Sequence, residues 1–133
     1  MLRITLPLFL LLSFKVLAHQ PKLINYSPLK DNPHMVTSPE ISKAYYSKLT
    51  GAPHYYQINS DKEFLFYTSI LSPKVGDAHI SFSIDVLDEG HKIIYRADGS
   101  DFLWTAWYEP YARDWYWKGP EIGTDSGKEF KTN

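Results

Sequence analysis

The alternation of apolar and polar residues over Ile80–Val86 limits the fold of this chain more than any other feature of its sequence. The apolar members are Ile80, Phe82, Ile84 and Val86, and Ser81, Ser83 and Asp85 lie between them. A period of two places one set on each face of a β-strand. Asp88–Gly90 then has the residues of a turn into a second strand, Lys92–Arg96, so the segment predicts a half-buried hairpin.

Other short apolar segments are separated by turn residues. They predict strands at His54–Asn59 and Phe64–Leu71, and further turns at Ser60–Lys62 and Ala97–Ser100. Short strands at this spacing are typical of a sandwich or an open barrel. We therefore expect a mainly β protein of 133 residues, with a small antiparallel β-sandwich over residues 38–122 and a polar tail over 123–133.

One helix is expected, at the start of this domain. Ser38-Pro39-Glu40 has the residues of a helix N-terminus, and apolar residues follow at helical spacing until Gly51. The sequence therefore predicts one short N-terminal helix. The proline-marked segment 19–37 before it is expected to be an extended lead-in with at most one short strand, Lys22–Tyr26.

The N-terminus has the pattern of a signal peptide over residues 1–18. A basic start is followed by an apolar run from Ile4 to Phe14 and a small residue, Ala18, at the expected cut. A retained membrane anchor is the alternative, but a span needs about 20 apolar residues and Lys15 interrupts this run. We expect cleavage after Ala18 and a periplasmic or secreted protein.

The expected mature chain is acidic and contains no cysteine. Removing the first 18 residues leaves 12 basic and 15 acidic residues, a formal charge of −3. No basic face is visible that would meet phosphates, so a nucleic-acid partner is not expected. No later apolar run is long enough for a transmembrane span. Thiol catalysis is excluded, and the domain must fold without disulfides.

Several segments resemble a known family. They are His19–Pro21, Ser38–Tyr46, Leu49–Tyr56, Tyr108–Tyr111 and Trp115–Glu121. Together they resemble a family of uncharacterised exported prokaryotic proteins with no assigned activity, and the resemblance covers most of the mature chain. It implies an exported β protein, similar in strand order to the small β-sandwich modules appended to secreted bacterial enzymes. Family members continue with a further strand, so we expect here either a truncated chain or a sheet with an unpaired edge.

The aromatic run between Phe102 and Pro120 is the first candidate site. It holds all four tryptophans, namely Trp104, Trp107, Trp115 and Trp117. Such rings fill a core, mark protein interfaces, or stack on sugars and peptides. Strand neighbours face opposite sides, so the four rings are not expected all to point inward. The contacts expected for a carbohydrate or peptide ligand are Trp107, Tyr108, Trp115, Trp117 and Arg113.

His19 is the second candidate. Cleavage after Ala18 would place its α-amine beside its imidazole, and these two nitrogens chelate copper when a second histidine completes the site. Secreted copper oxygenases and copper carriers are similar in this one respect. The available partners are His34, His54, His79 and His91. The alternative is an ordinary polar residue that happens to follow the cut.

These observations favour a binding function over catalysis. The Gly-x-Ser-x-Gly, His-Glu-x-x-His and phosphate-loop patterns are all absent from the sequence. We expect a non-catalytic binding or accessory module that uses its aromatic residues. The alternatives are a copper-binding protein or oxidase built on His19, and a structural envelope protein whose free sheet edge pairs with a partner strand.

Overall fold

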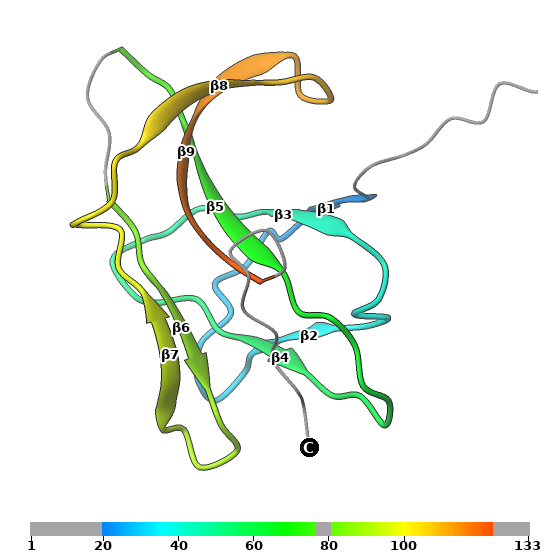
Figure 1. Cartoon of the computed structure of the whole chain (residues 1–133). Coiled ribbons are helices and arrows are strands. Elements are labelled where there is room, and N and C mark those ends of the chain that lie inside the picture. Colours follow the sequence, from blue (N-terminus) through cyan, green and yellow to red (C-terminus); the bar gives the residue numbers. More distant parts are fainter. Residues whose placement is uncertain (1–19, 77–80, 124–133) are drawn as a thin grey trace, which may run out of the picture. The chain divides into compact units, whose positions relative to one another are not determined.

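The computed structural model describes residues 20–76 and 81–123, which form nine strands (Figure 1). The expectation of a mainly β protein is confirmed. The chain divides into two compact units, Met1–Asn59 and Ser60–Asn133, with the division inside the span predicted to be one domain. Over the two described ranges, no helix has the length and hydrophobicity that a membrane crossing requires.

The first unit contains two pairs of short parallel strands. Strand β1 (Gln20–Leu23) pairs with β3 (Lys43–Tyr46), and β2 (His34–Val36) pairs with β4 (Tyr56–Ile58). Because parallel strands need a crossover connection, each pair joins segments about 20 residues apart in sequence. Among residues 20–59, the buried apolar residues are Ile24 and Pro28, which follow β1.

The predicted N-terminal helix is wrong, since strand β3 occupies the middle of the predicted segment. Ser38 has a φ of 49°, whereas a helix N-cap requires extended backbone. The Lys43 ammonium donates to the carbonyl oxygens of Thr37 and Ser38, each at 2.6 Å. Pairing with β1 and the aromatic Tyr45 and Tyr46, which favour strands, outweigh the weak helical spacing.

The lead-in prediction is also corrected, because residues 19–37 contain two strands rather than at most one. Strand β1 begins at Gln20, two residues earlier than predicted, and β2 (His34–Val36) was not expected. Both strands are four residues or shorter and pair with segments beyond residue 40. Pairing between distant segments leaves no local pattern in sequence, so the prolines alone suggested an irregular chain.

The second unit contains a three-stranded and a two-stranded antiparallel sheet (Figure 1). The first has the order β5-β9-β8, formed by Thr68–Pro73, Asp114–Ile122 and Thr105–Glu109. The second pairs β6 (Ile84–Leu87) with β7 (Ile93–Ala97), which confirms the predicted hairpin. Strand β9 therefore lies between two partners and positions both of them.

Strands β5 and β6 begin later than predicted. Strand β5 begins at Thr68 rather than Phe64, and β6 begins at Ile84, whereas Ile80 lies outside the described residues. Phe82 lies outside strand β6, and its backbone closely approaches Gly99. A Cβ at Gly99 would lie 1.7 Å from the Phe82 carbonyl oxygen, so this close approach requires glycine.

Trp104 is the central buried ring of the second unit, with 6% of its surface exposed. Its indole N–H donates to the Gly99 carbonyl at 2.8 Å, and its ring meets Phe82 edge-on with centroids 6.4 Å apart. Gly119 of β9 lies against the same ring. One side chain thus contacts the chain before β6, the turn after β7 and the middle of β9.

Candidate functional site

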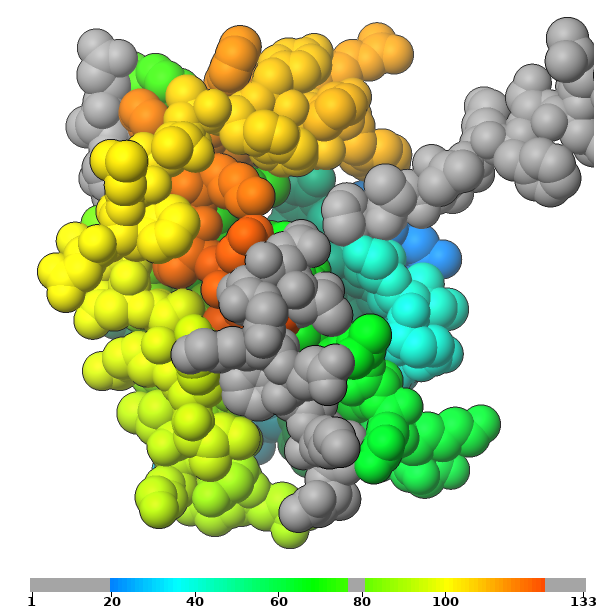
Figure 2. All heavy atoms as spheres, viewed as in Figure 1, coloured from blue at the N-terminus to red at the C-terminus, as the bar shows by residue number. Residues whose placement is uncertain are grey.

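The β8–β9 hairpin distributes the aromatic run over two faces. Its register pairs Ala106 with Trp117, Trp107 with Tyr116, and Tyr108 with Trp115. Side chains alternate along a strand, so directly opposed residues share a face and adjacent residues do not. Tyr108, Trp115 and Trp117 therefore lie on one face, which we call the aromatic face. Atoms of this hairpin, gold to orange, reach the surface at the top of Figure 2.

Tyr108 and Trp115 form an exposed pair on the aromatic face. Their ring centroids lie 5.6 Å apart, with planes inclined by 65°. The Tyr108 side chain is 44% exposed and that of Trp115 is 51% exposed. The expectation that the four tryptophans do not all point inward is confirmed, because Trp115 is exposed whereas Trp104 is buried.

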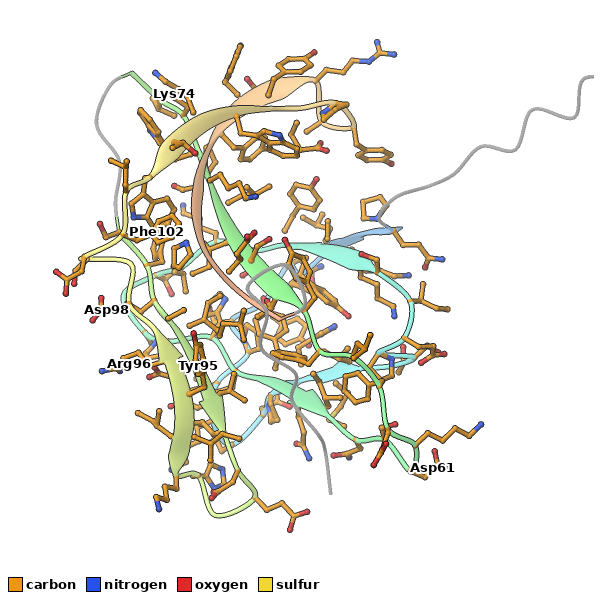
Figure 3. All side chains as sticks on the ribbon, viewed as in Figure 1. Asp61, Lys74, Tyr95, Arg96, Asp98 and Phe102 are labelled. Atoms are coloured by element: carbon orange, nitrogen blue, oxygen red, sulfur yellow. The ribbon has the colours of Figure 1, made fainter. Side chains whose placement is uncertain are left out.

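Trp117 continues the aromatic face toward strand β5. Its ring is half-buried, and the Lys74 ammonium lies 4.7 Å from the ring centroid, within the range of a cation–π contact. Lys74 follows the end of β5, as Figure 3 shows, and its ammonium also donates to the Gly76 carbonyl at 2.8 Å. The sequence did not suggest Lys74, because only the β5–β9 pairing brings it to Trp117.

Trp107 lies on the opposite face of the same hairpin, although it was predicted as a ligand contact with the others. It is 38% exposed and is paired with Tyr116. Asp114 lies on that face too. Burial raises the pKa of the Tyr116 phenol, and the negative charges of Asp114 and Glu109 raise it further. Trp107 therefore lies on the face that also carries Asp114, and not on the aromatic face.

The turn between β8 and β9 is held by Glu109. Its buried carboxylate accepts the Ala112 backbone N–H, and its carbonyl accepts the Arg113 N–H at 2.8 Å. Arg113 has a φ of 55° and is exposed at the turn. The predicted contact Arg113 is thus near the exposed pair in sequence, at the tip of the hairpin rather than on the paired strands.

The copper prediction is not tested. His19 and its potential partner His79 lie outside the described residues. In the described ranges, no group of three or more histidine and carboxylate side chains is placed to hold a metal ion. Two other histidines have protein partners, since His34 Nδ1 lies 2.7 Å from the Tyr26 hydroxyl and His54 Nδ1 lies 2.6 Å from the Ser47 hydroxyl.

Comparisons with known proteins assign no function to this site. No family model, curated protein or solved structure matches the chain. The resemblance to exported prokaryotic proteins therefore stays a prediction, and the function has to be argued from the residues themselves.

Proposed function

We propose that the protein is a non-catalytic binding module and that its aromatic face binds carbohydrate. The observation that carries this proposal is the exposed Tyr108–Trp115 pair, two large rings on one face of a rigid hairpin. Aromatic rings combine a flat apolar face with a polar group, and such faces stack on the C–H face of a pyranose ring. Burial does not explain these rings, because Trp104 already fills the core.

The angle between the two rings limits how a ligand is held. A flat chain of sugars needs coplanar rings, but these planes are inclined by 65°. A single pyranose ring would stack on Trp115 and touch the rim of Tyr108. Ser72, paired with Trp117 across β5 and β9, and the Lys74 ammonium add polar groups beside the aromatic face. The geometry favours recognition of one sugar residue over a long crystalline chain.

Charge favours a neutral sugar. Residues 60–133 carry 8 basic and 13 acidic side chains, a formal charge of −5. A field of that sign repels anionic ligands from the whole unit. A peptide is the alternative ligand, because proline-rich peptides dock in grooves lined by aromatic rings.

The proposal also includes the packing of the sheets and the cellular location of the protein. We infer that the two antiparallel sheets of the second unit pack as a small sandwich, because β7 contacts β9 and Trp104 touches segments of both sheets. We also infer that the chain is exported through its N-terminal segment, which places the module where free and cell-wall glycans occur.

The test is retention of the purified protein on amorphous, non-crystalline chitin, cellulose and xylan, in which single sugar residues are accessible to one aromatic ring. Trp115→Ala should lose retention while its melting temperature falls by no more than about 5 °C, because the half-exposed ring loses only its cross-strand contact with Tyr108. Trp107→Ala is the matched control, since it removes the same side chain from the other face of the hairpin. We expect that variant to be retained like the wild type.

Three results would oppose the proposal. Equal loss of retention in both variants would mean that the hairpin as a whole, rather than its aromatic face, is needed. A fall in melting temperature of about 10 °C or more in Trp115→Ala would mean that its ring has a structural role. If the protein bound an extended peptide but was retained on none of the polysaccharides, the ligand of the aromatic face would be a peptide.

A further inference from the structure

The first unit contains a surface pocket of about 240 Å³ that none of the preceding arguments uses. Its lining residues are Ile24, Asn25, Tyr26, Ser27, Lys48 and Thr50. They come from two segments, one directly after β1 and one directly after β3. These strands are parallel partners (Figure 1), so both segments leave the same edge of the pair, and the Ile24 N–H continues the ladder to the Tyr46 carbonyl at 2.8 Å.

One wall of the pocket is held in place by aromatic packing. The Tyr26 hydroxyl lies 2.7 Å from His34 Nδ1, and the His34 ring meets Tyr45 and Tyr56 edge-on at 5.2 and 5.8 Å. Tyr45 and Tyr56 also contact each other, with centroids 5.4 Å apart. Such packing orients Tyr26 before any ligand arrives, which is a property of built binding sites.

The polar groups of the pocket include one cation and no anion. Lys48 contributes an ammonium, Asn25 an amide, and Ser27 and Thr50 hydroxyls, whereas the lining contains no carboxylate. Burial raises the pKa of both Tyr45 and Tyr56, so the phenols behind the wall stay uncharged near neutral pH. The only full charge in the lining is therefore positive.

The charge of the surrounding unit has the same sign. Residues 20–59 contain four lysines, Lys22, Lys30, Lys43 and Lys48, and two acids, Asp31 and Glu40, a formal charge of +2. The Lys43 ammonium is occupied by backbone carbonyls. This unit thus contrasts with the acidic second unit, where we place a neutral ligand.

We propose that this pocket binds a small carboxylate-bearing molecule of the size of a sugar acid. Lys48 pairs with the carboxylate, Asn25, Ser27 and Thr50 bond to hydroxyl groups, and Ile24 packs against the carbon skeleton. The pocket is slightly smaller than the 300–1,000 Å³ typical of drug-sized ligands, which matches a single ring. The proposal is independent of the aromatic face, which lies in the other unit.

The test is a titration of the ¹⁵N-labelled protein with D-glucuronate, and with D-glucose as the uncharged control. We expect saturable amide shifts at residues 24–27, 48 and 50 with glucuronate and none with glucose. Lys48→Gln should weaken binding about tenfold or more, because a charge-assisted contact is lost. Lys30→Gln removes the same charge from the same unit outside the lining, and it should change affinity by less than about twofold.

Several results would overturn the proposal. They are no saturable shift with glucuronate, equal shifts with glucose, and equal weakening by Lys48→Gln and Lys30→Gln. Amide spectra of each variant without ligand would show that it is folded. Trp115→Ala separates this proposal from the carbohydrate function, because that variant should bind glucuronate like the wild type even where retention on polysaccharides is lost.

Discussion

Tyr108 and Trp115 face each other directly across strands β8 and β9, with ring centroids 5.6 Å apart and both side chains more than two-fifths exposed. Cross-strand aromatic pairs stabilise a hairpin without needing burial. The pair therefore has two effects, since it rigidifies the hairpin and presents the rings whose ligand we propose.

This pairing predicts measurable coupling between the two rings. In a double-mutant cycle of Tyr108→Ala and Trp115→Ala, the free energies of unfolding should show a coupling of about 0.5–1 kcal/mol. Tyr108 with Trp107 is the control pair, because these neighbours point to opposite faces and should be additive within about 0.3 kcal/mol. Urea denaturation measures both cycles, and equal coupling in the two would contradict the assigned faces.

Gly119 should tolerate no side chain. A Cβ at that position would lie 2.4 Å from the buried Trp104 ring, so Gly119→Ala is expected to destabilise the protein by about 1–3 kcal/mol. At Gly90 the nearest atom to an added Cβ is the Asp88 carboxylate oxygen at 3.3 Å. Gly90→Ala should therefore change stability by less than about 0.5 kcal/mol. Thermal unfolding followed by circular dichroism would compare the two, and similar melting temperatures would refute the packing around Trp104.

The Asp85–Arg96 ion pair should make stability depend on acid pH. The Arg96 guanidinium donates two hydrogen bonds to Asp85, at 2.6 and 2.7 Å, and this bonding lowers the pKa of the carboxyl. Arg96 lies on β7 in Figure 3. Because the folded pKa is below the unfolded value near 4, the stabilisation is present above that value and is lost as the pH falls through the folded pKa.

Asp85→Asn should therefore be less stable than the wild type at pH 7, and the difference should shrink as the pH falls from about 5 to 2. Asp61→Asn, in an exposed turn of the same unit (Figure 3), is the control and should keep the wild-type pH profile. Denaturant midpoints at a series of pH values would show the difference, and a constant difference at all pH values would argue against the ion pair.

Glu109 should matter for stability although it lies beside the candidate site. Replacing it with alanine removes the acceptor of the Ala112 N–H in a half-buried turn, at a cost of about 1–3 kcal/mol. Glu89 lies exposed in the β6–β7 turn, so Glu89→Ala should be nearly neutral. If Glu109→Ala lost polysaccharide binding at unchanged stability, Glu109 would contact the ligand, and its assignment to the turn would be wrong.

The sequence anticipated the local parts of the fold. The β6–β7 hairpin was predictable because alternation and turn residues are short-range signals, and β4 (Tyr56–Ile58) lies inside a predicted strand. The pairing of β1 with β3 was not predictable from the sequence. It joins Gln20 to Lys43, and contacts between such distant residues leave no local sequence pattern. Because of this long-range pairing, Lys43–Tyr46 forms a strand where a helix was expected.

The sequence predicted most residues of the candidate site but only part of their spatial arrangement. Alternation indicated that the tryptophans would divide between two faces, as Trp107 and Trp115 do. It could not show which face is more exposed, because that depends on what packs against each face. The Lys74–Trp117 contact and the pocket after β1 and β3 both depend on strand order. Neither was predictable from spacing.

The central claim is that Trp115 contacts a sugar, and the indole N–H signals of the four tryptophans test it most directly. These signals, assigned with single Trp→Phe variants, would be followed while a soluble chito- or xylo-oligosaccharide is added. The account predicts saturable movement of the Trp115 signal, a smaller shift for Trp117, and no change for the buried Trp104 or for Trp107 on the opposite face. Movement of Trp107 alone, or none of the four signals moving with any oligosaccharide, would contradict it.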